Sequence, residues 1–107
     1  MTMMLALLLV ALIQDGYRQV PLAQLATTRY THACTVGLVV YVRRQKDGDI
    51  HVTLVDGADK AVAEIIPALP LPRPKKGQRI RVCGITRIDR YHGWAELHPV
   101  LRWQVAP

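Results

Sequence analysis

Short runs of β-branched residues, each followed by a turn signal, recur between residues 34 and 103 and constrain this chain more than any other feature. Apolar and polar side chains alternate along these runs, which is the period-two pattern of a strand with one buried face. Two Asp-Gly pairs, at positions 47–48 and 56–57, are strong hairpin signals between runs. The sequence therefore predicts an all-β domain of short strands joined by tight turns.

Five runs are present, at residues 34–42, 50–55, 60–66, 78–88 and 94–103. In the first run Gly37 predicts a bulge or a sharp bend. In the last run Pro99 is expected to end or bulge the strand, because proline cannot donate to a sheet ladder. We expect the inward face of these strands to carry Val36, Leu38, Val40, Val42, Ile50, Val52, Leu54, Ile80, Val82, Ala95 and Leu97.

The longest connection separates the third and fourth runs and is rich in proline. Residues 67–74 contain four prolines, at positions 67, 70, 72 and 74, and such a segment is excluded from the middle of a sheet. Five short strands, a long third connection and a glycine-bent first strand fit the five-stranded OB-fold barrel best. The predicted fold class is therefore an all-β OB-fold over residues 34–107.

The N-terminal third of the chain has a different composition. Residues 3–13 are continuously apolar, which is too short for a bilayer span of about 20 residues but matches the central region of a signal peptide. A short buried helix is the alternative, because no Lys or Arg precedes the run and no A-x-A cleavage site follows it. We assign residues 1–14 to an apolar leader and residues 15–33 to an extension with one helical turn beginning at Pro21.

Four stretches of this chain resemble small bacterial OB-fold proteins, often exported, whose function is poorly defined. The stretches are VGLVVYVRRQKDGDIHVTL, AEIIP, PKKGQRIRVCGI and DRYHGWAELHPV. The last contains a fairly specific closing motif, H-G-W-x-E-[IL]-H-P-V, at residues 92–100. The resemblance covers about residues 34–101, most of the chain, although the glycine of the first strand is shifted and the connection between the third and fourth strands is short for the family. It implies the OB-fold and carries over no catalytic residues.

The leader and the resemblance together favour an exported protein, periplasmic or extracellular, with a cytoplasmic location as the alternative. The 107 residues form one domain. No stable membrane span is expected.

The charge of the chain favours an anionic partner. Its formal net charge is +6 at pH 7, although such a charge also serves solubility alone. Arg43, Arg44 and Lys46 fall on the first hairpin, and Arg87 and Arg90 flank the turn before the last strand. OB-folds bind oligomers between these two loops.

Aromatic residues near the same loops suggest base stacking, which is how single-stranded nucleic acid is bound without sequence preference. The predicted ligand-binding residues are Tyr41, Arg43, Arg44, Lys46, His51, Arg87, Arg90, Tyr91, His92 and Trp94. A second basic run, at Arg73, Lys75 and Lys76, is interpreted as a solvated connector.

The same face also supports a different class of function. Its predicted residues include Val62 and Ile66, which suit a protein partner, and Glu64, which would repel phosphate. The alternative hypothesis is therefore an exported envelope or extracellular protein-interaction module, in which the charge serves solubility.

We expect neither a cofactor, nor a metal ion, nor an enzyme active site. His92 and His98 lie six positions apart near Asp89 and Glu96, and this spacing gives no obvious convergence of zinc ligands. A structural hydrogen bond is the expected role of His98. The chain contains no serine, and both cysteines fall on strands rather than where thiolates are activated.

The two cysteines, Cys34 and Cys83, allow one disulfide. In an OB-fold the start of the first strand lies opposite the end of the fourth, which brings them together. The expected face assignment places Cys34 inward with Val36 and Cys83 outward, and paired residues must share a face. We therefore expect the disulfide only if a bulge at Gly37 reverses the face of Cys34.

Overall fold

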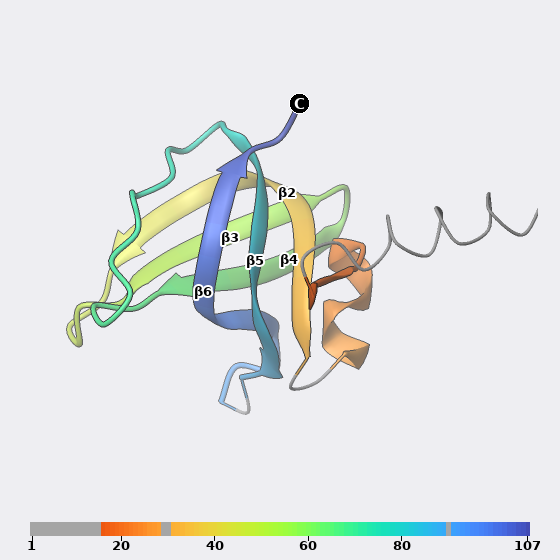
Figure 1. The fold of residues 1–107 in the computed structure, drawn as a ribbon, viewed down its shortest axis with the longest axis horizontal. Coiled ribbons are helices and arrows are strands. Elements are labelled where there is room, and N and C mark those ends of the chain that lie inside the picture. Colours follow the sequence, from red (N-terminus) through yellow and green to blue (C-terminus); the bar gives the residue numbers. More distant parts are fainter. Residues whose placement is uncertain (1–15, 29–30, 90) are drawn as a thin grey trace, which may run out of the picture.

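The computed structural model describes residues 16–28, 31–89 and 91–107, so the predicted leader at 1–14 lies outside the described residues. No helix within the described ranges is long and apolar enough to cross a membrane. The elements, shown in Figure 1, are β1 (Arg18–Gln19), the 3₁₀ helix η2 (Leu22–Thr27), β2 (His32–Arg44), β3 (Ile50–Asp56), β4 (Asp59–Ile65), β5 (Arg79–Ile88) and β6 (Ala95–Val105).

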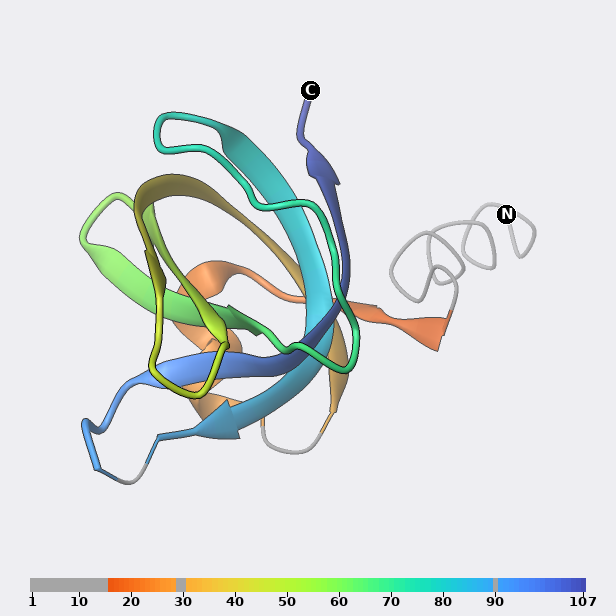
Figure 2. The ribbon, with the colours of Figure 1, turned by 90° about the vertical axis from the view of Figure 1, so that its left-hand side faces the viewer.

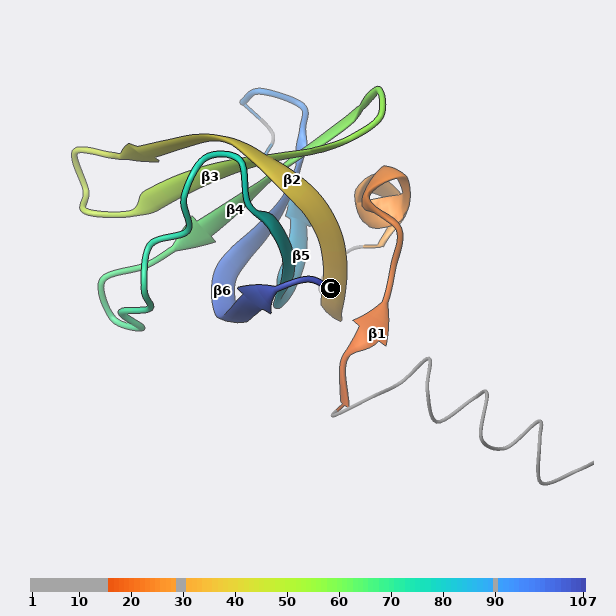
Figure 3. The ribbon, with the colours of Figure 1, turned by 90° about the horizontal axis from the view of Figure 1, so that it is seen from above.

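Five of these strands close into a barrel in the order β2-β3-β4-β6-β5, and a β2–β5 ladder joins the two ends. The pairs within this barrel are antiparallel except β4–β6, which is parallel. Figures 1 and 3 show β5 and β6 crossing the layer formed by β3 and β4, while β2 curves from one layer into the other. This is the OB-fold, and the prediction of an all-β, five-stranded barrel is confirmed.

The inward face of β2 differs from the predicted one. A Cβ added at Gly37 would lie 3.1 Å from the Cβ of Leu54 in the core, so Gly37 faces inward. Leu38 is therefore on the outer face and is 39% exposed, whereas Val39 is buried. The bulge lies between Val39 and Tyr41. It reverses the alternation, so the inward assignment was wrong for Val36 and Leu38, and Val40 lies at the bulge itself. Of the four residues predicted to face inward in β2, only Val42 packs against the core.

Cys34 and Cys83 are direct partners in the β2–β5 ladder and form a disulfide. The ladder runs without a register shift from His32 to Leu38, so the bond requires no bulge at Gly37. The expectation that the disulfide needs a bulge at Gly37 was wrong. Cys34 does share a face with Val36, as expected, but that face is the outer face of the barrel. Both cysteines are on the same side of the sheet, and the pairing rule is satisfied.

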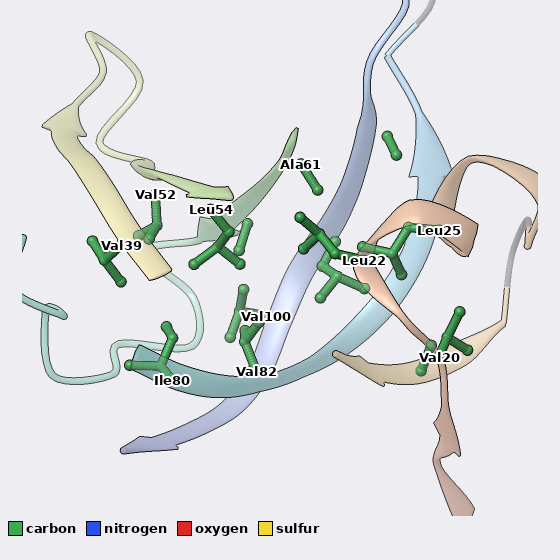
Figure 4. Packing of buried hydrophobic residues seen from close by; sticks show 14 of the residues in the cluster. Val20, Leu22, Leu25, Val39, Val52, Leu54, Ala61, Ile80, Val82 and Val100 are labelled. Carbon is green, nitrogen blue, oxygen red and sulfur yellow. The ribbon is translucent and has the colours of Figure 1, made fainter. Parts of the chain in front are cut away.

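The core fills the barrel and is closed at one end by the N-terminal segment. Figure 4 shows Leu22 and Leu25 of η2 pointing toward the valines and leucines of the strands. The helix begins one residue after the predicted start, with Pro21 in the N-cap position. Its two leucines are three positions apart, which places them on one face of a 3₁₀ helix. The buried set contains the predicted residues Val52, Leu54, Ile80, Val82, Ala95 and Leu97.

The last strand passes through Pro99 as a bulge, which is one of its two predicted outcomes. Leu97 pairs with Thr86 and Val100 pairs with Gly84. The two residues between them in β6, His98 and Pro99, therefore lie opposite a single residue of β5. Further along, Trp103 packs against the core and its Nε1 donates a hydrogen bond to the Pro72 carbonyl at 2.7 Å. This bond attaches the proline-rich connector to the barrel.

The disulfide should contribute strongly to stability, because it closes a 49-residue separation that the unfolded chain would otherwise explore. A Cys34→Ala/Cys83→Ala variant should lose about 2–4 kcal/mol of unfolding free energy, measured by urea denaturation. A reductant should destabilise the unchanged protein by a similar amount and leave the variant unaffected. Equal unfolding midpoints for the two oxidised proteins would contradict this expectation.

Gly84 should not tolerate a side chain, because the β6 bulge lies against it. A Cβ there would lie 2.4 Å from the Pro99 carbonyl oxygen and 3.2 Å from the Cα of Val100. We expect Gly84→Ala to cost about 3 kcal/mol or more by forcing the two strands apart. Gly77→Ala is the control, since its Cβ meets nothing within 4 Å and only its φ of 92° opposes alanine. It should cost about 1–2 kcal/mol.

Candidate functional site

A groove of about 480 Å³ lies over β3 and β4, between the β2–β3 loop and the β5–β6 loop. Figure 2 shows both loops, yellow and light blue, extending toward the lower left of the barrel. Polar and aromatic side chains dominate the walls of the groove. The lining residues are Tyr41, Arg43, Gln45, Asp47, Asp49, His51, Thr53, Lys60, Glu64, Asp89, His92 and Trp94.

The β2–β3 loop is shaped by its Asp-Gly pair. The Asp47 carboxylate accepts a hydrogen bond from the Asp49 amide at 2.9 Å, and Gly48 has a φ of 93°. The loop places Gln45 over β3, where its Nε2 donates to Nδ1 of His51 at 2.8 Å. Burial lowers the pKa of His51. His51 therefore enters the groove as a neutral hydrogen-bonding group rather than as a cation.

The β5–β6 loop is organised by Asp89 and by an aromatic stack. The Asp89 carboxylate accepts hydrogen bonds from the amides of Tyr91 and His92 and from His92 Nδ1, and the bond with the His92 side chain lowers the pKa of Asp89. The His92 ring stacks on Trp94, with centroids 4.2 Å apart. Trp94 also contacts His51 edge-on and lies 5.6 Å from the Lys60 ammonium. Trp94 is therefore the support of this cluster.

An acidic cluster lies at one end of the groove. His98 Nε2 is 3.3 Å from Glu64 Oε2 and 3.5 Å from Asp49 Oδ2. Each of the three residues offers one ligand atom, and these atoms lie within 4.8 Å of one another. The three side chains could therefore hold a metal ion. Arg87 donates to the fully buried Glu96 and approaches Glu64 at 4.0 Å. Burial and then the charge of Glu96 raise the pKa of Glu64 to about 7.

The structure brings together five of the predicted ligand-binding residues, since Tyr41, Arg43, His51, His92 and Trp94 all line the groove. Arg44, Lys46 and Tyr91 are exposed outside it, Arg87 is held by Glu96, and Arg90 lies outside the described residues.

Sequence reasoning missed three groove residues of consequence. Lys60 was overlooked although it shares a face with Glu64 by period two in the third strand. Asp49 was overlooked because an aspartate directly after an Asp-Gly pair is expected to shape the turn. Gln45 carried no signal, because its contact with His51 depends on how the loop folds back. Val62, expected to offer apolar surface to a protein partner, is only 1% exposed.

Comparisons with known proteins identify the fold. No family model matches the sequence, and no curated protein is significantly similar to it. The S. pombe Stn1-Ten1 complex contains a similar structure, with a TM-score of 0.60, 20% identity, and coverage of 89% of this chain and 81% of that chain.

Two synthetases also match. The asparaginyl-tRNA synthetase of Entamoeba histolytica has a TM-score of 0.65 and 17% identity over 85% of this chain and 24% of its own. A putative aspartyl-tRNA synthetase from Leishmania major Friedlin has a TM-score of 0.64 and 15% identity over 85% of this chain and 21% of its own. The chain therefore spans about a quarter or less of these enzymes. These likenesses show that the chain is an OB-fold protein.

Glu64 should make the stability of the protein depend on pH. Its pKa is about 7 in the folded chain against an ordinary 4.5, so the folded state binds the proton more tightly and stability falls as pH rises through this interval. With metal ions chelated, we expect Glu64→Gln to be more stable than the unchanged protein near pH 8, by at most about 3 kcal/mol. Below about pH 4 the difference should disappear.

Urea denaturation at both pH values measures this effect. Asp47→Asn, at an exposed position of the same groove, is the control and should show no such pH-dependent gain. A gain for Glu64→Gln that is equal at both pH values would mean that Glu64 ionisation does not oppose folding.

Proposed function

We propose that this protein is a non-catalytic OB-fold module that binds single-stranded nucleic acid, or a similar anionic polymer, in the groove over β3 and β4. The observation that carries the proposal is the position of the groove. It lies on the face and between the two loops that OB-folds use for oligomeric ligands, and its walls carry both cationic and aromatic side chains.

The cations of the groove would contact the phosphate backbone. Arg43 and Lys60 line it from β2 and β4, and Arg44 and Lys46 are exposed on the adjoining hairpin. A net charge of +6 would add long-range attraction to a polyanion. Binding of this kind releases counterions, so affinity should fall steeply as salt rises.

The aromatic side chains of the groove differ in how far their neighbours already occupy them. Trp94 is already engaged by His92, His51 and Lys60, so its ring holds the other side chains in place. Tyr41, which is 52% exposed, has the accessible ring that base stacking requires. We therefore assign stacking to Tyr41, whereas the His92 ring is held between Trp94, on which it stacks, and Tyr91, whose centroid lies 5.0 Å away.

The similar structures support nucleic acid as the choice among polyanions, since two of them belong to tRNA synthetases. A non-catalytic role is supported by the chemistry available, because both cysteines are used in a disulfide and the sequence has no serine. An exported location remains part of the proposal. The disulfide supports it, because such bonds persist mainly in oxidising compartments.

Fluorescence anisotropy with labelled single-stranded DNA and RNA at several salt concentrations tests the proposal. Tyr41→Ala should weaken binding about 5- to 150-fold, the equivalent of 1–3 kcal/mol for one stacked base. Arg43→Glu should weaken binding and reduce its salt dependence.

Arg73→Glu is the matched control, because it makes the same charge change on the exposed connector, outside the groove. If the two arginine variants lose affinity equally, binding depends on net charge and not on the groove. If no oligonucleotide binds to the unchanged protein at low salt, the proposed function is wrong.

A further inference from the structure

We propose that Asp49, Glu64 and His98 form a binding site for a divalent transition-metal ion of the Zn²⁺ type at the edge of the groove. Metal binding itself does not depend on the proposed nucleic-acid function. The proposal rests on the geometry of three side chains, on their rigid placement, and on the excess of negative charge around them.

The two distances from His98 to the carboxylates fit metal coordination better than a charge-assisted hydrogen bond, and the ligand atoms of all three residues lie within 4.8 Å of one another. Ligands that lie about 2.0–2.2 Å from a tetrahedral zinc ion are about 3.3–3.6 Å from one another. His98 Nε2 is 3.3 Å from Glu64 Oε2 and 3.5 Å from Asp49 Oδ2. A charge-assisted hydrogen bond from a protonated His98 would bring these atoms to about 2.7–2.9 Å. The spacing of His98 from each carboxylate is therefore that of two ligands on a common ion.

The three ligands are supplied by well-defined parts of the fold. Glu64 and His98 stand on β4 and β6, which pair in parallel with Ala63 opposite Leu97, so the two side chains occupy adjacent positions on the same face. Asp49 is held by the hydrogen bond of its amide to the side chain of Asp47. The side chains of the three ligands are only 13–24% exposed. A site with this degree of preorganisation loses little conformational entropy when the ion binds.

Negative charge is concentrated around these ligands although the chain is basic overall. Glu96 lies on the same strand and face as His98, is fully buried, and has one oxygen, Oε2, without a hydrogen-bond partner among the described residues. Arg87 contacts Glu96 and approaches Glu64, so the ion pairs of the described residues set only Arg87 and His98 against the carboxylates of Asp49, Glu64 and Glu96. Buried charge without a partner is costly, and a divalent cation would supply the missing positive charge.

The chemistry of the ligands indicates which ion fits. An imidazole nitrogen with two carboxylate oxygens suits Zn²⁺ and related transition metals, whereas Mg²⁺ prefers oxygen ligands and retains its waters. Three protein ligands would leave a coordination position open. Asp49 and Glu64 line the groove, so a phosphate oxygen is the kind of ligand that this position would accept. The inference that a phosphate oxygen fills this position rests on the proposed function, and the metal site itself does not.

Calorimetric titration of the oxidised, untagged, chelator-treated protein with Zn²⁺ tests the site, and Co²⁺ provides a spectroscopic probe. We expect one equivalent to bind, with the intense visible absorption of four-coordinate cobalt and with Mg²⁺ at least about tenfold weaker. Asp49→Asn and His98→Gln should each weaken Zn²⁺ binding at least about tenfold.

Two matched controls should retain Zn²⁺ affinity. Asp47→Asn removes a charge from the same loop but keeps a side-chain oxygen that accepts the hydrogen bond of the Asp49 amide, and His92→Gln changes a histidine of the same groove. Circular dichroism verifies the fold of each variant, and Asp49→Asn, in a loop, keeps the test valid if His98→Gln fails to fold. Absence of saturable Zn²⁺ binding to the folded protein, or unchanged affinity in Asp49→Asn, would overturn the metal site. Oligonucleotide binding measured separately, with and without Zn²⁺, distinguishes this outcome from failure of the proposed function.

Discussion

The pairing of β2 with β5 is the constraint on which the rest of the molecule depends. This ladder converts a five-stranded sheet into a closed barrel and joins residues far apart in the chain, from His32 with Ile85 to Leu38 with Arg79. The Cys34–Cys83 disulfide reinforces it at a directly paired position. Because β2 also pairs with β3 beyond its bulge, the same strand that closes the barrel carries Tyr41 and Arg43 to the wall of the groove.

Barrel closure also determines which polar groups meet. The parallel β4–β6 pair brings Glu64 and His98 side by side, and the β2–β3 hairpin adds Asp49 to them. The groove therefore combines two kinds of surface: a basic and aromatic one near Arg43, Lys60 and His92, and an acidic one around Glu64. A cation bound at the acidic end would remove the charge that most opposes a phosphate backbone there, so the two proposals are physically compatible.

Much of the fold followed from local patterns, and the error in the inward face of β2 has a physical origin. The alternation in β3, β5 and β6 placed Leu54, Val82 and Leu97 in the core correctly, because the bulge of β6 lies beyond Leu97. In β2 the alternation was interpreted without the bulge at Val39 and Tyr41, and the inward face was reversed at Leu38. A bulge depends on which partner strand is present at each point, and a single strand's sequence does not contain that information.

The sequence by itself determined the strands, the turns and the basic, aromatic character of the two loops, because periodicity and Asp-Gly turns are local properties. It also limited the chemistry, through the absence of serine and the presence of only two cysteines. Only the tertiary structure decided that Arg87 is turned toward Glu96, that Trp94 supports its neighbours, and that His98 meets Asp49 and Glu64 instead of His92. These contacts join residues from separate strands and loops, and their partners are chosen by strand register and barrel closure.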